Sequence, residues 1–504
     1  MSNKARFFRS GILLTLVGLA MRTVAMFFGA FISRTVGAEG TGLYTLVMTV
    51  YSFAVTFATS GISLTVTRLV ASAVGEGRKE VAGGVMRGAV LYSLFFGSLA
   101  TLGLFFGADM LGERVLSDVR TVAALKVLSL SLIPAALSAA FSGYFVGVKR
   151  VSFNAAASVM CQLLKIALTV VLVIRLLPYG IVSAVVGLCL GITLTELVGF
   201  GLIFIEYLYD SRKNRLQSKD CPPQVASVSK MALPLAFSAY VRSFLLNIEH
   251  ILIPRKLRER GESSAEAYAH YGILHGMALP LIMYPMSPLS SFSGLLVPEF
   301  AEDMAAGRGE RMSSVASRAL NTTLAYATVS AVFIFTFAEE LGYAIYKSYD
   351  AGYYISVLAL AVPIMYLDHV TDSMLKGIGE QVFSMWVNIS DSLLSVALVW
   401  LLIPRLGIMG YAVVIIVMEL YNFALSFARL RRKIHFKIAF FHGLALPLLA
   451  SAFSALLTRL LFSFGGSGVR PVWLILKMLF ALALTAACLA IMTLKNEKRR
   501  KNTI

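Results

Sequence analysis

The sequence predicts an all-α polytopic membrane protein with about 14 transmembrane helices, arranged as two six-helix lobes plus two appended helices. Composition is the first reason, since 58% of the 504 residues are hydrophobic, 14% are charged, and the mean hydropathy is +0.78. The second is the alternation of long apolar runs with short polar segments, which is typical of helices that cross a bilayer. The third is an internal repeat at a spacing of about 230 residues, which predicts two lobes of the same topology.

Each predicted span is an apolar run that can cross the hydrocarbon core, which takes about 20 helical residues. The first run, 12–34, carries one charge in its middle, Arg22, close to the bilayer midplane. This run is too long for a signal-peptide core, so we expect it in the mature protein. The predicted spans are 10–33, 43–70, 83–107, 121–146, 155–177, 180–208, 230–253, 269–297, 313–338, 353–375, 383–403, 408–428, 438–463 and 471–494.

The basic residues are distributed unequally between the two sides of these spans. With the N-terminus inside, the inner segments hold 25 lysines and arginines and the outer segments hold 11. This asymmetry predicts a plasma-membrane protein with both termini in the cytoplasm. It also explains the net charge of +18 without a nucleic-acid partner, because the charges alternate between loops. One outer segment, 255–260, is basic and departs from the rule.

The internal repeat sets the expected domain boundaries. Landmarks recur at an offset of 229 or 230 residues: Pro134 and Pro363, Gly147 and Gly377, Phe153 and Phe383, Gly180 and Gly410. Each copy holds six spans, an even number, so both copies enter the membrane from the same side. We expect a first lobe at 1–209, a cytoplasmic linker at 210–229, a second lobe at 230–432, and two appended helices with a basic tail at 433–504.

Two lobes joined by a linker predict an alternating-access transporter whose cargo site lies between them at midplane depth. An enzyme is not expected, because the sequence has no phosphate-binding loop GxxxxGK[ST], no Cys/His metal spacing and no nucleophile elbow GxSxG. We therefore expect no cofactor and no metal site. The sequence leaves open whether the membrane potential, Na⁺ or H⁺ supplies the energy.

Arg22 and Arg242 lie in the middle of the first span of each lobe. An arginine at the midplane costs several kcal/mol unless it faces water or a partner, so both are candidate cargo-binding residues. Their planar arrays of donors suit phosphate or carboxylate, which favours an anionic cargo headgroup. The alternative is that they snorkel or pair with carboxylates for structure alone, and Glu249, two turns from Arg242, is the candidate partner.

Other ionisable residues lie inside predicted spans. Lys165, central in the fifth span, is a candidate cavity-lining residue. His275 in the eighth span either donates into the cavity or makes a hydrogen bond between helices. Asp368 and Asp372 are four residues apart and share a helix face, so they bind a cation, relay a proton or pair with lysine. We assign charge pairing or coupling to Glu249, Asp368 and Asp372.

The segment that follows Arg22, SRTVGAEGTGLY at 33–44, resembles the stage V sporulation protein B group. The resemblance continues through Gly61-Ile62-Ser63 and Arg68-Leu69-Val70-Ala71 and extends across most of the chain. This group belongs to the multidrug/oligosaccharidyl-lipid/polysaccharide exporter superfamily, which also includes the MurJ lipid II flippases and the MATE exporters. The resemblance implies a V-shaped two-lobe fold, with the helices at 438–494 forming a groove for a lipid tail.

The resemblance also implies a flippase that moves an undecaprenyl-pyrophosphate-linked saccharide, lipid II or a related cell-wall precursor, from the inner to the outer leaflet. Arg22 matches a cavity arginine of the MurJ first helix. Two other MurJ cavity arginines fall near Phe28 and His275, so His275 supplies positive charge only when it is protonated. The predicted substrate-binding residues are Arg22, Arg242, His275, Lys165 and Arg68.

Two other functions stay open at this point. A cation-coupled multidrug exporter of the same superfamily would resemble its relatives in having an acidic residue in the first helix, and 12–33 has none. A non-transporting scaffold for envelope synthesis or sporulation would leave Arg22 and Arg242 unexplained. The expected partners are the lipid-linked saccharide and membrane lipids, with a monomer as the expected state and envelope-synthesis proteins as candidate partners.

Overall fold

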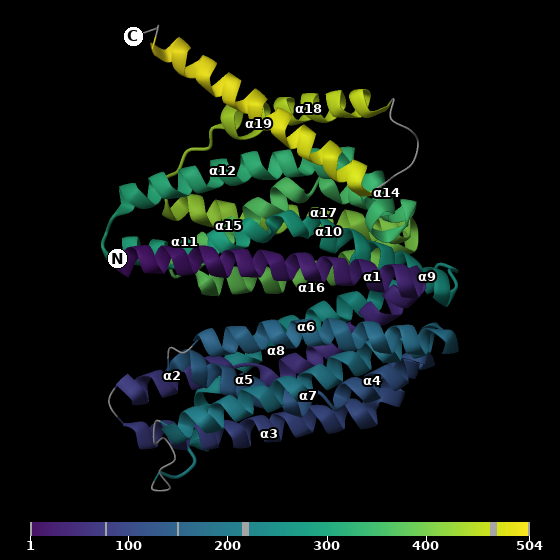
Figure 1. Cartoon of the computed structure of the whole chain (residues 1–504), viewed down its shortest axis with the longest axis vertical. Helices are drawn as coiled ribbons and strands as arrows, with labels where there is room; N and C mark the ends of the chain where they lie inside the picture. The colour runs from purple at the N-terminus through teal and green to yellow at the C-terminus, as the bar shows by residue number, and fades with distance from the viewer. Residues whose placement is uncertain (1–2, 76–77, 149–150, 214–220, 464–470, 502–504) are drawn as a thin grey trace. The chain divides into compact units, whose positions relative to one another are not determined.

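Every described element of the computed structural model is a helix, which confirms the all-α prediction (Figure 1). The structure describes residues 3–75, 78–148, 151–213, 221–463 and 471–501. The chain divides into two compact units. Unit 2 is Glu39–Ala269, and unit 1 combines Met1–Ala38 with His270–Ile504.

Unit 2 is a helical bundle with two apolar cores. The first core surrounds Leu43, Leu125 and Tyr268, and the second surrounds Phe141 and Tyr144. The helices of unit 2 are the second part of α1 (Asn3–Thr59), α2 (Ile62–Gly75), α3 (Lys79–Met110), α4 (Val122–Ser129), α5 (Leu132–Gly147), α6 (Val151–Leu176), α7 (Ile181–Lys213), α8 (Val225–Glu259) and most of α9 (Ser264–Tyr271).

Unit 1 begins with the first part of α1, which is held to the rest of that unit by polar contacts. The Thr23 hydroxyl lies 2.6 Å from the Tyr284 hydroxyl, and Arg34 donates to the backbone carbonyls of Ala344 and Ile345. The other helices of unit 1 are α10 (Leu279–Met283), α11 (Ser287–Ala305), α12 (Gly309–Thr336), α13 (Ala338–Leu341), α14 (Tyr349–Ala359), α15 (Val362–Gly377), α16 (Gln381–Leu406), α17 (Ile408–Lys433), α18 (Leu446–Ser463) and α19 (Pro471–Lys501).

The internal repeat is confirmed in the local conformation of the chain. The first residues of α3 and α12 are 230 residues apart, as are those of α5 and α15 and of α6 and α16. A pair of helices bent at a short break occurs in both copies. The angle is 42° between Val119–Ser129 and Leu132–Gly147, and 57° between Tyr349–Ala359 and Val362–Gly377. Ser117 and Lys347, the two described non-glycine residues with positive φ, are also 230 residues apart.

Each of the predicted spans falls on a helix or on a series of consecutive helices, but the count of 14 is not confirmed. In the described residues, 8 helices are long and apolar enough to cross a membrane, or up to 10 if each bent pair is one span. The predicted span 230–253 falls on α8, which carries Arg242, Asn247, Glu249 and His250 and is correspondingly less apolar. The predicted span 269–297 is interrupted by a π-helical segment, Gly272–Ala278, and a 3₁₀ turn, Tyr284–Met286.

The compact units and the predicted lobes divide the chain differently. The first part of α1 packs within unit 1, and α8 packs on α2 and α3 within unit 2. The predicted linker is also anchored to α3. The backbone N–H of Gln224 donates to the Gly84 carbonyl at 3.0 Å, and the Arg87 side chain donates to the Cys221 carbonyl. The units follow packing and the lobes follow the sequence repeat, so the lobe boundaries at 209, 230 and 432 stay a prediction.

The appended helices belong to unit 1. α18 packs against α19 and against α12 (Figure 1). Ser451, Ser454 and Thr458 are buried on α18 and each donates to the backbone carbonyl four residues earlier, at 2.6, 2.7 and 2.7 Å. These internal bonds satisfy the hydroxyls inside the apolar helix. The lipid-tail groove implied for this region stays a prediction.

The connection between α15 and α16 carries a carboxylate held by two cations of α17. Glu380 accepts from Arg429 at 2.8 Å and pairs with Lys433 at 2.8 Å, while the Arg429 guanidinium lies 5.0 Å from the centre of the Phe383 ring. The hydrogen bonds from Lys433 and Arg429 lower the pKa of Glu380. The cluster therefore holds the start of α16 against the end of α17 only while Glu380 is ionised.

We expect this cluster to make stability depend on acidic pH. A carboxyl whose pKa is lowered in the folded state contributes its full stability above the unfolded value of about 4.3 and loses it as pH falls through the folded value. Glu380→Gln should therefore make the melting temperature fall less steeply between pH 6 and pH 3. The corresponding change in the free energy of unfolding should not exceed the ~1 kcal/mol typical of exposed ion pairs. Thermal unfolding in detergent at both pH values measures this, and parallel curves for the two proteins would contradict it.

Candidate functional site

The two arginines predicted to bind the cargo lie on long helices. Arg22 is in α1, but its side chain lies outside the described residues. Arg242 is in the middle of α8, its side chain is exposed, and it makes no hydrogen bond or ion pair within the described part of the chain. Arg242 is thus a cation at mid-helix with its donors available.

Among the described residues no ion pair joins Glu249 to Arg242, and the charge-pairing role of Glu249 stays a prediction. The Glu249 side chain is buried, whereas that of Arg242 is exposed. Seven residues along an α-helix correspond to about 10 Å, so a shared face is not sufficient for contact. No described contact of Arg242 supports the alternative in which it is a structural ion-pair residue.

Lys165 and Arg68 are both in unit 2 but in different environments. Lys165 is half-buried in α6 and interacts electrostatically with Glu196 of the neighbouring helix α7. Arg68 is exposed on α2. The structure shows no described contact between these two residues and Arg242, so their roles in substrate binding stay predictions.

His275 lies in the π-helical segment Gly272–Ala278 and is half-buried. Its ring stacks on Tyr271, with ring centres 5.3 Å apart and an angle of 7° between the planes. π-Helical turns inside α-helices are often found at functional sites. The stacking fixes the orientation of the imidazole, and its role as a donor stays a prediction.

Four carboxylates come together in unit 1 on helices α15, α16 and α17. Asp368 of α15 interacts electrostatically with Asp372 and Asp391, and Glu419 of α17 interacts with Asp368 and Asp391. Asp372 pairs with Lys376 at 2.5 Å and accepts from the Ser384 hydroxyl, so lysine pairing is observed for this residue. Within the described residues, no group of three or more His, Cys, Asp or Glu side chains is arranged to hold a metal ion.

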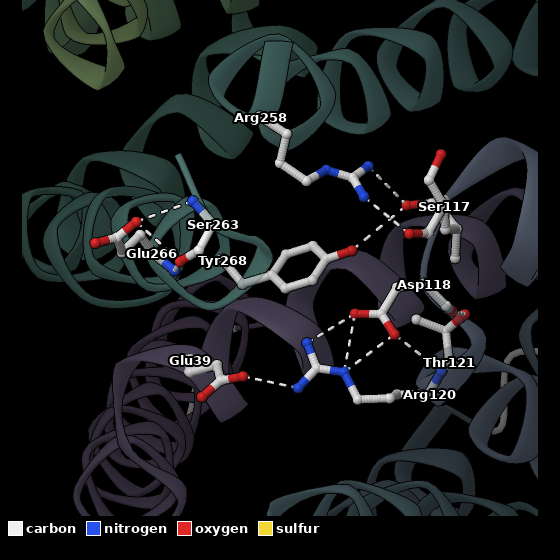
Figure 2. Close-up of polar contacts among 10 residues, drawn as sticks. Glu39, Ser117, Asp118, Arg120, Thr121, Arg258, Ser263, Glu266 and Tyr268 are labelled. Atoms are coloured by element: carbon white, nitrogen blue, oxygen red, sulfur yellow. Dashed lines mark hydrogen bonds and ion pairs between the residues drawn. The ribbon is translucent and has the colours of Figure 1, made fainter. Parts of the chain in front are cut away.

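A polar cluster that the sequence did not identify lies in unit 2 (Figure 2). Arg120 donates to Asp118 through Nε at 3.0 Å and Nη2 at 2.7 Å, and to Glu39 through Nη1 at 2.7 Å. The Asp118 side chain is only 7% exposed. Arg120 thus joins the second part of α1 to the start of α4 through a fork of charge-assisted hydrogen bonds, the strong type.

Tyr268 of α9 lies between two guanidinium groups in the same cluster, with Arg120 5.8 Å and Arg258 6.0 Å from its ring centre. Arg258 also donates to the carbonyls of Ser117 at 2.8 Å and Leu116 at 3.1 Å. Gly42 is required at this point, because an added Cβ would lie 1.8 Å from the Tyr268 carbonyl oxygen. Figure 2 shows these side chains converging on Asp118 and the Ser117 carbonyl.

Both connections to unit 1 start from this cluster. The chain passes between the units after Ala38 and after Ala269, directly beside Glu39 and Tyr268. Gly37, which precedes the first passage, has a φ of 72° and kinks α1. The one sequence signal for the cluster is the basic outer segment 255–260, whose Arg258 is used in these contacts.

A family model described as "Polysaccharide biosynthesis protein" matches residues 7–304, more than half of the chain. The chain belongs to this family. A second model, described as "MatE", matches residues 263–401. Stage V sporulation protein B of Bacillus subtilis (strain 168) is 26% identical over 420 residues, which cover 82% of this chain and 81% of that protein. The resemblance stated from the sequence is confirmed.

Two solved structures of membrane transport proteins have a fold similar to that of this chain. The lipid II flippase MurJ in an inward closed conformation has a TM-score of 0.72 at 12% identity, covering 95% of this chain and 98% of that chain. A multidrug resistance MATE family transporter of the MOP superfamily, in an inward-facing conformation, has a TM-score of 0.65 at 16% identity, covering 83% and 98%. The chain therefore shares the fold of these two proteins, and its long apolar helices make it a multi-pass membrane protein.

Proposed function

We propose that this protein is a flippase that carries an undecaprenyl-pyrophosphate-linked saccharide, lipid II or a related cell-wall precursor, from the inner to the outer leaflet. The observation that carries the proposal is Arg242, an exposed cation in the middle of α8 with no ion pair among the described residues. The family and the MurJ-like fold support the same reading.

The physical argument concerns the charge of the cargo. A pyrophosphate carries negative charges that lose their hydration as the headgroup crosses the membrane, at a cost of several kcal/mol per ion. A guanidinium at midplane depth offsets this cost through paired donors. A neutral sugar or a cationic drug would gain nothing from such a residue. Arg242 is therefore assigned to the pyrophosphate, together with Arg22 of the first helix.

The proposal includes a plasma-membrane location with both termini in the cytoplasm, which the loop charges support. His275, Lys165 and Arg68 are proposed to contact the headgroup, and the carboxylates of α15 are proposed to couple transport to Na⁺, H⁺ or the membrane potential. One of these carboxylates, Asp372, pairs with Lys376 at 2.5 Å.

The direct test is flipping in proteoliposomes that contain the purified full-length protein and a fluorescent undecaprenyl-pyrophosphate-linked saccharide. We expect protein-dependent movement of this lipid between leaflets, and none for the same saccharide on an uncharged dolichol-like alcohol. Applying a Na⁺ gradient, a pH gradient and a membrane potential one at a time identifies the coupling. Equal movement of the charged and uncharged lipids would contradict the anionic-headgroup argument.

A cation-coupled multidrug exporter is the second candidate, because four carboxylates converge on α15, α16 and α17. An exporter of cationic drugs would use such a cluster for its cargo or its coupling ion. The same vesicles loaded with a cationic dye decide between the candidates: we expect no dye movement, and dye movement without lipid flipping would favour the exporter.

A further inference from the structure

A groove in unit 1, distinct from the predicted cargo residues, contains a cation that has no carboxylate partner among the described residues. The groove has a volume of about 480 Å³ and lies between α11 and α12. Its lining residues are Phe292, Glu299, Arg311, Ser314, Val315, Arg318, Ala319 and Thr322. The volume falls within the range of about 300–1,000 Å³ found for small-molecule sites.

The two arginines of the groove are in different states. Arg311 is paired, at 3.2 Å from Glu299 and 3.5 Å from Asp303, whose side chain is 1% exposed. Arg318 is exposed, and its one described polar contact is a 3.3 Å hydrogen bond from Nη2 to the Ser314 hydroxyl. Since Glu299 is neutralised by Arg311, the free charge of the groove is the positive charge of Arg318.

Arg318 lies on α12 inside the predicted membrane span 313–338. It follows Gly309, the first residue of α12, by nine residues, which corresponds to about 14 Å. The helix continues through an apolar segment to Thr336. An arginine at this depth is costly unless it meets water, a carboxylate or a lipid phosphate. The α11–α12 connection is the end that the loop charges predict to be cytoplasmic, so the groove opens at inner-leaflet depth.

We propose that this groove binds a phosphate-bearing lipid of the inner leaflet, with the phosphate on Arg318 and an apolar chain against Phe292, Val315 and Ala319. The Ser314 contact orients the guanidinium in the groove, and the hydroxyls of Ser314 and Thr322 supply further donors to phosphate oxygens. The charge of the groove and its apolar wall together match an amphiphile with an anionic head.

The lipid phosphate has two sources in such a membrane, a glycerophospholipid and an undecaprenyl phosphate. The shared chemistry is a phosphate ester on an apolar chain, and the groove recognises that chemistry. The inference does not depend on flipping, since binding at α12 is measured directly. A protein that flips no lipid would still bind here, and a flippase without this site would still flip.

The test is photo-crosslinking of the full-length protein in vesicles. Phosphatidylglycerol with a diazirine near its headgroup is activated, and the labelled peptides are mapped. We expect labelling within 309–322, reduced about tenfold by Arg318→Gln, because a charge-assisted bond to phosphate is lost. Ser314→Asp should reduce labelling similarly, since its carboxylate would occupy the guanidinium. Arg431→Gln, which removes an exposed arginine of α17 without a described partner, should have no effect.

Two further arms identify the source and limit the proposal. In the first arm, undecaprenyl phosphate is added at the same concentration as the phosphatidylglycerol probe. If it reduces labelling, the site binds isoprenoid phosphates as well as glycerophospholipids; if labelling is unchanged, the site binds glycerophospholipid. A diacylglycerol probe, which has no phosphate, should not label 309–322. The proposal is overturned if diacylglycerol labels this segment equally, or if Arg318→Gln leaves phosphatidylglycerol labelling unchanged.

Discussion

Arg242→Ala is expected to abolish flipping of a pyrophosphate-linked lipid while leaving the protein folded and inserted. The Arg242 side chain is exposed and makes no hydrogen bond or ion pair within the described residues, so its removal breaks no described contact. Its loss leaves the headgroup charge uncompensated at midplane depth, which raises the barrier by several kcal/mol and lowers the rate at least a hundredfold. Initial rates in proteoliposomes, normalised to inserted protein, measure the effect.

Three matched variants separate charge from geometry and position. Arg242→Lys keeps the charge but loses the paired donors, so we expect partial activity. Lys230→Ala removes an exposed cation near the start of the same helix and should leave the rate unchanged. Arg22→Ala should behave as Arg242→Ala. If both alanine variants flip at the wild-type rate, the arginines are structural and the anionic-cargo argument fails.

Arg120→Ala is expected to cause the largest loss of stability. It would leave the Asp118 carboxylate, 7% exposed, without its guanidinium partner. Breaking a buried pair costs about 3–5 kcal/mol, and because Arg120 itself is 35% exposed we expect about 2–3 kcal/mol. The melting temperature in detergent can be followed with a thiol-reactive dye, since the buried thiol of Cys189 becomes accessible on unfolding.

A double-mutant cycle tests whether the buried charge is the cause. Asp118→Asn removes that charge, so the combined Arg120→Ala and Asp118→Asn protein should be more stable than Arg120→Ala alone. Arg114→Ala, an exposed arginine six residues earlier with no described partner, is the control and should change little. A double variant less stable than either single variant would show that the cluster acts through packing and not through charge.

Much of the fold could be predicted from the sequence because the signals are local. Apolar length placed the predicted spans on helices, and recurring residues such as Pro134 and Pro363 indicated a repeat that the structure reproduces at an offset of 230 residues. The number of spans could not be settled in this way. Polar residues in α8 and π and 3₁₀ turns before α11 interrupt the simple relation between an apolar run and one straight helix.

The candidate site was predictable only where one residue carried the signal. Arg242 is conspicuous because a lone arginine in an apolar run is costly wherever its neighbours lie. The Arg242–Glu249 pair stays a prediction, because spacing along a helix gives the face of a residue but not its reach. The groove around Arg318 was missed, since its walls come from two helices whose packing the sequence does not describe.

By itself, the sequence determined the membrane class, the repeat and the family, all of which depend on composition and order along the chain. Only the tertiary structure decided which charges meet. Arg120 contacts Glu39, 81 residues away, and Arg258 contacts Ser117, 141 residues away. Such pairs arise from the packing of helices around a shared core, and their geometry is fixed by close contacts such as Gly42 against Tyr268, which no local pattern encodes.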